Sequence, residues 1–271
     1  MIHSIKHQTI LDYETTPTSV VQRLHLTPPN LSSQRVAKWD IIVEGGAIVM
    51  EAVDYHGNKV HLCKHDAHAT RMQITCLGQV DVSDTHGIVG EHDNGLPLDL
   101  FKNSTHLSLP GPRLRQLSKE IERFERGDQN SELQVLHDLS ARVLANIKYS
   151  KGKTNVNTTA EKAMGIGAGV CQDHVHAFTS VARLLGFSAR YVSGYLMMRN
   201  EETQEASHAW AEIHVRDLGW VGFDISNGIA PDERYVKLAT GFDYTDVIPL
   251  SGIRLGSGEE QIATRIMINQ Q

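Results

Sequence analysis

The sequence predicts an α+β fold with two domains: an N-terminal antiparallel domain similar to a β-sandwich, and a C-terminal domain of helices and strands. Residues 1 to about 100 alternate polar and apolar side chains with the period of two expected of half-buried strands. Residues 112 to about 185 repeat apolar side chains with the helical period, and the period of two returns from residue 188. At 271 residues the chain is long enough for two domains, which we place at 1–105 and 106–271.

The N-terminal strands are predicted from three stretches of alternating polarity. These are "VVQRLHLTP", "WDIIVEGGAIVMEAVDYHGNKVHLCKH" and "MQITCLGQVDV". The pair Gly45–Gly46 and the segment 55–58 supply residues that tolerate the positive φ of tight turns. We therefore expect a hairpin at each of these two positions.

Two amphipathic helices are predicted after the turn at 109–112. Leu114, Leu117, Ile121 and Phe124 share one face of the first. Ser131 and Gln134 form a capping-box pattern at the start of the second. The apolar side chains that follow on one face of that second helix are Leu136, Leu139, Val143, Leu144 and Ile147.

A short helix is expected around 160–164, and a longer one starts at or beside Cys171. Glycines at 165, 167 and 169 interrupt the chain just before this cysteine. The apolar stripe of the longer helix continues to Leu185, and Gly186 is a natural C-terminal stop. Strands follow in "SARYVSGYLM", "SHAWAEIHV", "GWVGFDI" and "QIATRIMIN".

Composition narrows the partners and the compartment. The formal charge of −6 and the pI near 6.2 provide no basic field for nucleic acid, so no nucleic-acid partner is expected. The first residues lack the apolar core of a signal peptide, and no window is long and apolar enough for a membrane span. We therefore expect a cytoplasmic protein without a membrane partner, and make no prediction of its oligomeric state.

The three cysteines are Cys63, Cys76 and Cys171. An odd number without a CxxC pair favours neither a disulfide framework nor a structural zinc site. Cys171 could be a nucleophile, a metal ligand or a core residue. A helix N-terminus stabilises a thiolate and offers N–H donors to an oxyanion, which suits a nucleophile. Without partner residues, however, packing in the core is the simpler interpretation of a cysteine at this position.

Metal binding at Cys171 is the second alternative. Asp173, His174 and His176 lie within five residues of it, but zinc ligands usually come in pairs from two separate segments, and no second pair stands out. We therefore expect no metal and no other cofactor. His174 and His176 are interpreted as structural residues.

A candidate base and a candidate acid lie on two consecutive strands. His208 shares a face with Trp210 in the first, and Asp224 is the one acid in the otherwise apolar second. If paired residue numbers sum to about 432 to 434, Asp224 lies opposite His208 or one diagonal step away. Sums near 436 would separate them, and a bulge at Gly219 would shift the register. A cysteine, a histidine and an aspartate brought together would form an activated thiol.

The sequence resembles the transglutaminase-like superfamily, specifically bacterial members with an N-terminal β-domain. The blocks that carry the resemblance are "GVCQDHVHAF", "LLGFSARYVSGYL", "SHAWAEIHV", "GWVGFDISNG" and "DERYVKLATGFDYTDVIPLSGI". The resemblance implies a papain-like catalytic core with Cys171 as nucleophile, His208 as base and Asp224 as acid. Ile225 stands where the family usually has proline, so we expect a change in the loop and not in the chemistry.

The predicted function is that of a thiol enzyme, most simply a cysteine peptidase or amidase acting on a peptide or protein substrate. Transfer of the acyl group to an amine, as in transglutaminases, is one alternative. A non-catalytic interaction scaffold is another, and a metal-dependent hydrolase using Cys171 and His174 is a third. Trp210 and Tyr191 are candidate substrate-binding residues, because aromatic side chains near a catalytic base can form the wall of a cleft.

Overall fold

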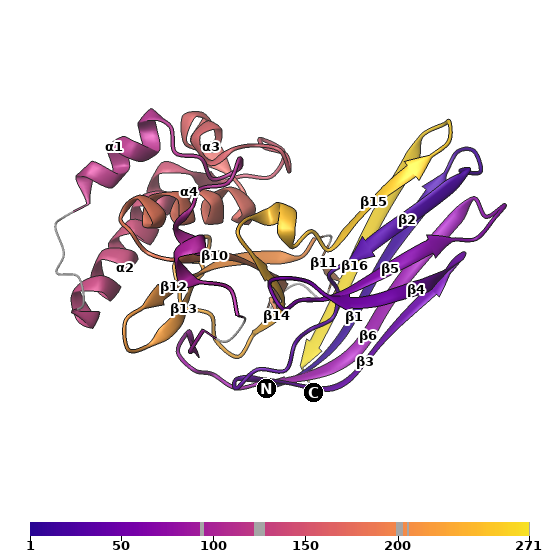
Figure 1. Cartoon of the computed structure of the whole chain (residues 1–271), viewed down its shortest axis with the longest axis horizontal. Helices are drawn as coiled ribbons and strands as arrows, with labels where there is room; N and C mark the ends of the chain where they lie inside the picture. Colours follow the sequence, from indigo (N-terminus) through magenta and orange to yellow (C-terminus); the bar gives the residue numbers. More distant parts are fainter. Residues whose placement is uncertain (93–94, 122–127, 199–202, 205, 271) are drawn as a thin grey trace.

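The structure, a computed structural model, describes residues 1–92, 95–121, 128–198, 203–204 and 206–270. It has the predicted α+β composition (Figure 1). Its helices and strands are, in chain order, β1 (Ile2–Tyr13), β2 (Ser19–Leu24), β3 (Gln34–Glu44), β4 (Gly46–Val53), β5 (Lys59–His65), β6 (Arg71–Val82), β7 (Ile88–Gly90), η1 (Leu98–Lys102), α1 (Pro112–Glu120), α2 (Gln129–Asn146), β8 (Lys148–Tyr149), α3 (Ala160–Ile166), β9 (Ala168–Gly169), α4 (Cys171–Leu184), β10 (Ala189–Leu196), β11 (Thr203–Gln204), β12 (His208–Val215), β13 (Gly219–Phe223), β14 (Tyr235–Gly241), η2 (Tyr244–Asp246), β15 (Leu250–Leu255) and β16 (Glu260–Gln270).

The N-terminal strands form two facing sheets, which we call the β unit. One sheet has the strand order β11-β16-β1-β6-β3 and the other has the order β15-β2-β5-β4. Apolar side chains from both sheets fill the space between them, among them Leu11 and Ile74 from the first and Leu24 and Cys63 from the second. Two antiparallel sheets with a shared core form a sandwich, as predicted.

The chain returns to the β unit at its C-terminal end. β15 pairs with β2, and β16 pairs with β1 along eleven residue pairs from His3↔Gln270 to Tyr13↔Glu260. The division into 1–105 and 106–271 stays a prediction. The sheets themselves do not divide there, because the last two strands pair with the first two.

One predicted turn is confirmed and the other is wrong. β4 and β5 pair as a hairpin from Val53↔Lys59, with Gly57 at φ +84° in the turn. β3 and β4, however, do not pair with each other, since β3 pairs with β6 and β4 with β5. Gly45, at φ +73°, therefore carries the chain from one sheet of the sandwich to the other. Alternating polarity locates strands but does not tell which sheet each strand joins.

The helices begin and end close to the predicted positions. Leu114 and Leu117 are buried on the inner face of α1, and Ile121, also buried, is its C-cap residue; Phe124 lies outside the described residues. The predicted cap of α2 is wrong, because α2 starts earlier than expected. The cap is Asp128, whose carboxylate accepts a hydrogen bond of 3.0 Å from the backbone N–H of Ser131.

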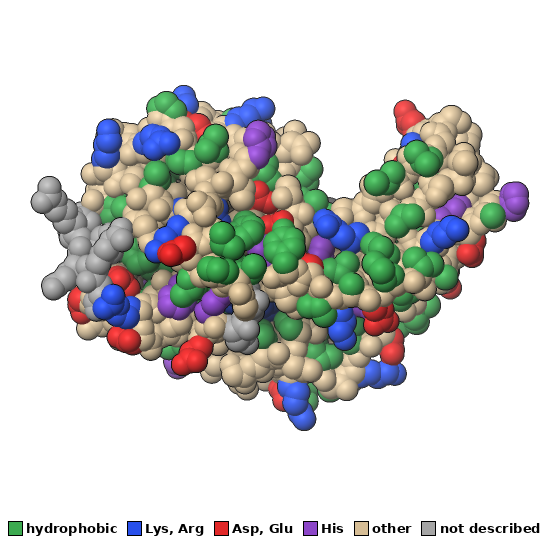
Figure 2. Space-filling model, in the orientation of Figure 1, with side chains coloured by type: hydrophobic (Ala, Val, Ile, Leu, Met, Phe, Trp, Pro, Cys, Tyr) green, Lys and Arg blue, Asp and Glu red, His purple; other side chains and the backbone are tan. Residues whose placement is uncertain are grey.

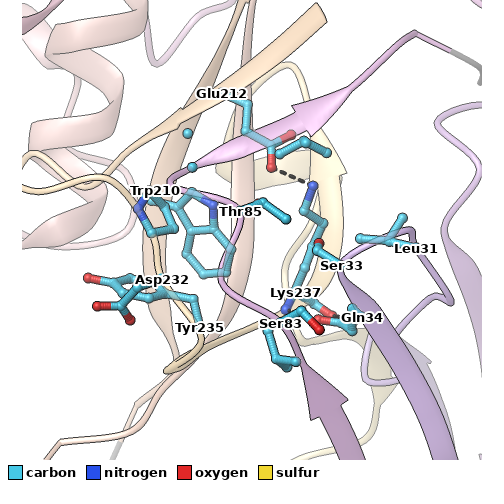
Figure 3. A pocket seen from close by; sticks show the side chains of 15 residues that line it. Leu31, Ser33, Gln34, Ser83, Thr85, Trp210, Glu212, Asp232, Tyr235 and Lys237 are labelled. Atoms are coloured by element: carbon cyan, nitrogen blue, oxygen red, sulfur yellow. Dashed lines mark hydrogen bonds and ion pairs between the residues drawn. The ribbon is translucent and has the colours of Figure 1, made fainter. Parts of the chain in front are cut away.

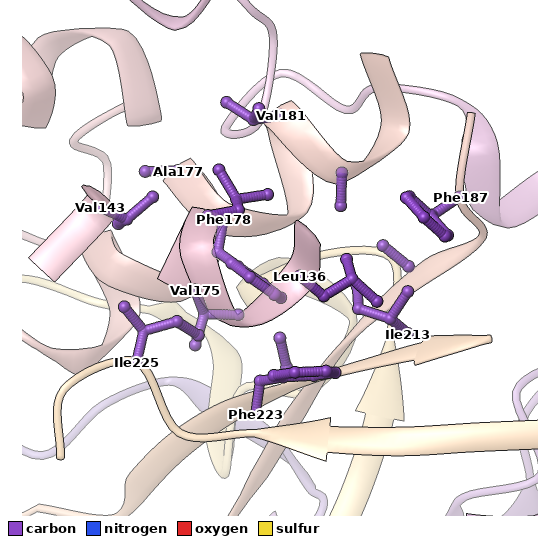
Figure 4. Packing of buried hydrophobic residues seen from close by; sticks show 14 of the residues in the cluster. Leu136, Val143, Val175, Ala177, Phe178, Val181, Phe187, Ile213, Phe223 and Ile225 are labelled. Carbon is purple, nitrogen blue, oxygen red and sulfur yellow. The ribbon is translucent and has the colours of Figure 1, made fainter. Parts of the chain in front are cut away.

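The core sheet has the order β14-β10-β12-β13-β7, and α4 packs across it. Phe178 of α4 lies against Phe223 of β13, with ring centroids 5.4 Å apart (Figure 4). Leu136 of α2 joins the same apolar cluster. Burying one leucine or phenylalanine side chain stabilises the folded state by about 1.5–3 kcal/mol. The packing fixes α4, and therefore Cys171 at its start, relative to β12 and β13.

The surface carries charges of both signs and is hollowed between the helical end of the molecule and the tips of the β-unit strands (Figure 2). Within the part of the chain that the structure describes, no helix has the length and apolar composition needed to span a membrane.

We predict that Gly45→Ala destabilises the protein more than Gly152→Ala does. Both glycines have positive φ, near +73° and +76°, so alanine at either site costs about 1–2 kcal/mol in backbone strain. A Cβ at Gly45 would also lie 2.1 Å from the carbonyl oxygen of Arg71, whereas a Cβ at Gly152 meets nothing within 4 Å. The clash adds about 1–3 kcal/mol, measurable by urea denaturation. Equal losses in the two variants would contradict this interpretation of the sheet crossing.

Candidate active site

Cys171 is the first residue of α4, as predicted, and is partly exposed. The carboxylate of Asp173 closes the start of the helix by accepting hydrogen bonds from the Val170 N–H (2.8 Å) and the Thr154 hydroxyl (2.6 Å). A Cβ on Gly169 would lie only 2.6 Å from that carboxylate, so glycine is needed for the close approach. The last glycine before the cysteine thus serves the geometry of the helix start.

The register of β12 and β13 falls within the favourable range predicted from the sequence. Ala211 pairs with Phe223 and Val215 with Gly219, so paired numbers sum to 434. Gly219 has φ +74° but introduces no shift between these pairs. Asp224 therefore lies one diagonal step from His208, on the same face.

His208 and Asp224 form a buried pair. The His208 Nε2 donates to Asp224 Oδ2 at 2.7 Å, and the Asp224 side chain is 0% exposed. The same oxygen also accepts hydrogen bonds from Asn227 Nδ2 (2.6 Å) and from the Tyr235 hydroxyl (2.7 Å). Three donors at one buried carboxylate oxygen hold the acid in its ionised form.

Burial and hydrogen bonding act in opposite directions on these two groups. Burial would raise the pKa of Asp224, but the donors from His208, Asn227 and Tyr235 together with the charge of His208 hold it below its usual value. Burial would likewise lower the pKa of His208. Hydrogen bonds to Asp224 and Cys171, and the charges of both, outweigh burial and raise that pKa to about 10. The two partners therefore favour the protonated form of the imidazole.

The Cys171 sulfur is the second partner of this imidazole. A hydrogen bond between the two side chains is among the causes that raise the pKa of His208. Because Nε2 is engaged by Asp224, Nδ1 is the ring nitrogen left for the sulfur. The structure thus brings together the three residues from α4, β12 and the end of β13 on which the sequence prediction depends. A nucleophile, a proton donor and an orienting acid can perform acyl transfer in this arrangement.

Trp210 and Tyr191 are each only 2% exposed. The Trp210 ring lies nearly parallel to the His208 ring, 28° between planes and 6.4 Å between centroids. Tyr191 lies 5.3 Å from the His176 ring and 6.2 Å from the Tyr244 ring. Both aromatics support other residues of the site and present little surface to a ligand. Substrate binding by either of them stays a prediction.

A small cavity lies beside Trp210, toward the β unit (Figure 3). Its volume is about 40 Å³. Trp210 and Tyr235 line it, and among the described residues neither Cys171 nor His208 does. Lys237 and Glu212 form an ion pair at its wall. A cavity of this size holds water and not a peptide side chain.

His174 and His176 are structural, as interpreted from the sequence. The ring nitrogens of His174 contact the Ser226 hydroxyl and the Ile147 carbonyl oxygen, each at 2.7 Å. His176 Nε2 accepts from the backbone N–H of Tyr244 at 3.3 Å, and burial lowers the His176 pKa to about 4. Across the described ranges, no three His, Cys, Asp or Glu side chains gather as a metal-binding group. Both ring nitrogens of His174 make hydrogen bonds within the protein, so neither is free to serve as the ligand that a metal-dependent hydrolase would require.

Sequence reasoning missed Asn227, Tyr235 and Tyr244. Asn227 follows Asp224 by three residues in a turn, a spacing typical of local side-chain hydrogen bonding. Tyr235 and Tyr244 stand in the last family-like block of the sequence, but nothing in the pattern indicates that their strand and turn lie beside Asp224 and Cys171. Ile225, in the usual proline position, is fully buried in the core, and Asp224 pairs with Ile229 across the loop that follows.

Two family models match the chain. Residues 115–225 match the transglutaminase-like superfamily, and residues 3–81 match the bacterial transglutaminase-like N-terminal region. The resemblance drawn from the sequence blocks is thereby confirmed. The first match contains Cys171, His208 and Asp224.

Similar proteins cover the chain almost from end to end. An uncharacterized protein of Mycobacterium tuberculosis is 28% identical over 284 residues, 96% of this chain and 90% of that protein. One of Mycobacterium leprae is 27% identical over 276 residues, 98% of each. A solved structure named a "putative cysteine protease", from Cytophaga hutchinsonii, superposes with a TM-score of 0.78 at 20% identity, covering 99% of this chain and 90% of that chain. The papain-like, transglutaminase-like fold is thus confirmed.

We predict that Asp224→Asn lowers the pKa of His208 by about two pH units or more, because burial then acts against a weaker partner. The raised pKa of about 10 against the ordinary 6.5 stabilises the wild-type fold fully below pH 6.5, and this contribution is lost as the pH rises toward 10. The stability gap between wild type and variant should therefore narrow over that interval. NMR titration of the ring protons measures the pKa directly, and an unchanged value would show that Asp224 does not hold the charge.

Proposed function

We propose that this chain, which carries a transglutaminase-like core and a bacterial transglutaminase-like N-terminal region, is a thiol enzyme that cleaves peptide or amide bonds. The single observation that carries the proposal is the buried His208–Asp224 pair at the sulfur of Cys171. A structural cysteine needs no charged histidine beside it. Burying a charged pair costs free energy, and buried groups with shifted pKa values cluster at functional sites.

In the first half of the proposed reaction, the Cys171 thiolate attacks the carbonyl carbon and forms a C–S bond. The oxyanion lies at the start of α4, where the Cys171 backbone N–H is a donor. The His208 imidazolium passes its proton to the amide nitrogen as the C–N bond breaks, and the amine leaves. A thioester and a neutral imidazole remain.

In the second half, water attacks the thioester and gives a proton to His208. The C–S bond breaks, the carboxylic acid leaves and the thiolate–imidazolium pair is restored. Because Cys171 is partly exposed, water can reach the thioester. A peptidase or amidase differs from a transglutaminase only in this step, in which an amine would replace water. The scaffold alternative lacks a reason for the buried charge at His208.

The partner that this chemistry requires is a peptide or protein substrate. A cytoplasmic location is part of the proposal, since a reducing compartment keeps a catalytic thiol and the buried Cys63 and Cys76 unpaired.

We predict that iodoacetamide alkylates Cys171 faster than Cys63 or Cys76 in the folded protein near neutral pH. Burial raises the pKa of Cys63 to about 11 and that of Cys76 to about 12, so both remain thiols. His208→Ala should slow alkylation of Cys171 about tenfold or more, because the thiolate loses its cation. Rates are read by peptide mass spectrometry. Equal labelling of the three cysteines would rule out an activated thiol.

We also predict that a peptide library incubated with a primary amine yields hydrolysed products from the wild type and none from Cys171→Ala. The variant should remain folded, since the side chain lies at a partly exposed helix start. Mass spectrometry separates cleavage, deamidation and amine transfer by product mass. Amine-linked products in excess over hydrolysis would overturn the peptidase assignment in favour of a transglutaminase.

A further inference from the structure

The turn between β4 and β5 is held rigid by its own side chains. Asp54 Oδ1 accepts from the backbone N–H groups of His56 and Asn58, each at 2.9 Å. Asp54 Oδ2 accepts from the Asn58 side-chain amide at 2.9 Å. Gly57 closes the turn in the left-handed region. The hairpin tip, residues 54–58, is therefore a preformed element that does not depend on the core for its shape.

This tip docks on residues 242–247 of the core, which we call the active-site loop. Asp246 accepts from the Tyr55 hydroxyl at 2.9 Å and contacts His56 Nε2 at 3.2 Å. The same carboxylate accepts from the backbone N–H of Phe242 at 2.8 Å and so closes the loop on itself. The His56 ring meets the Phe242 ring edge-on, 4.6 Å between centroids.

A second contact fixes the strand that leads into the loop. The side-chain amide of Asn58 donates to the Thr240 carbonyl oxygen, and its oxygen accepts from the Thr240 N–H, both at 2.8 Å. This bidentate pairing reproduces the bonds of a neighbouring strand at the end of β14. Side chains of the β unit thus hold the start and the end of the active-site loop.

Tyr244, in the middle of the loop, is bound to α4, the helix that begins at Cys171: its backbone N–H donates to His176 Nε2 at 3.3 Å. The pKa of its phenol is raised by burial and by the charge of Cys171. In Figure 1 the η2 turn that contains Tyr244 lies between the helical core and the β unit. The loop thus connects the hairpin tip to the surroundings of the nucleophile.

The active-site loop also forms one wall of a hollow of about 380 Å³. Phe242 and Thr245 line it from the loop side, and Leu107 and Asn157 line it from the other. Val156, next to Asn157, accepts a hydrogen bond from the side chain of Gln172, the residue after the nucleophile. The segment that lines the hollow on this side is thus bound to α4 through its neighbour Val156, and the hollow is large enough for a peptide side chain.

We propose that the β4–β5 hairpin is a brace for the active-site loop, and that through Asp246 it sets the width of a substrate subsite formed by the hollow between this loop and the segments at Leu107 and Asn157. The inference rests on the proposed thiol chemistry. It gives the β unit a role in substrate binding, with Tyr55 and His56 as positioning residues and Asp246 as the loop residue that both binds them and lines the hollow.

Asp246→Ala and Tyr55→Phe test the brace, with Asp138→Ala as a matched control on the exposed side of α2. Two reagents for Cys171 separate chemistry from binding: iodoacetamide, which is small, and a dipeptidyl chloromethyl ketone, which needs a subsite. In Asp246→Ala the inhibition constant KI of the ketone should rise about tenfold while iodoacetamide stays within about twofold of wild type. Tyr55→Phe should give a smaller rise, and Asp138→Ala none.

An unchanged KI in both variants, with normal iodoacetamide labelling, would overturn the brace and leave the thiol chemistry intact. Slow labelling of Cys171 in the wild type would instead overturn the proposed function. Melting temperatures are measured alongside. If Asp246→Ala unfolds, the KI of Tyr55→Phe tests the brace instead. This variant removes one hydroxyl and keeps the ring that stacks near Phe242.

Discussion

The hydrogen bond between His208 and Asp224 is the interaction on which the candidate site depends. A buried carboxylate and a buried imidazolium are costly apart and stable only together, with every remaining lone pair satisfied. Asn227 and Tyr235 complete that environment at Asp224, and the Cys171 sulfur completes it at His208. The arrangement is possible because the β12–β13 hairpin keeps a regular register and because the apolar faces of both strands pack against α4. The same packing that stabilises the core therefore sets the distance between sulfur, ring and carboxylate.

The two halves of the molecule are linked more closely than their order in the sequence indicates. β15 and β16 return to the sheets formed by the first strands, and the hairpin at 54–58 reaches the active-site loop from the opposite direction. The loop lies between these two attachments. The His208–Asp224 pair lies within the core, but its partner Tyr235 stands on β14, where Gln34 of β3 exchanges hydrogen bonds with the backbone of Lys237. The β unit therefore contacts both the active-site loop and the strand that carries Tyr235.

Sequence reasoning succeeded where local periodicity decides the structure. The start of α4 at Cys171 and its end before Gly186 follow from short-range pattern. The approach of His208 to Asp224 did not, because it depends on the register of β12 and β13, which only the structure supplies. Sequence reasoning failed where the interacting residues or strands are far apart in the sequence. The crossing at Gly45 was predicted as a hairpin because two strands in succession carry no mark of the sheet each will join. The sequence predicts the cap of α2 at Ser131, because Ser131 and Gln134 match the capping-box pattern and Asp128 has no such partner. Tyr235 and Tyr244 were missed since nothing local connects a strand or turn near residue 240 with Cys171.

The coupling of sulfur and imidazole can be tested most directly by the ultraviolet absorbance of the thiolate. A difference spectrum between wild type and Cys171→Ala at neutral pH isolates this one cysteine, because Cys63 and Cys76 are present in both proteins. Our interpretation predicts a thiolate band at neutral pH that disappears in His208→Ala. A spectrum at neutral pH without that band, or a band that persists in His208→Ala, would contradict it.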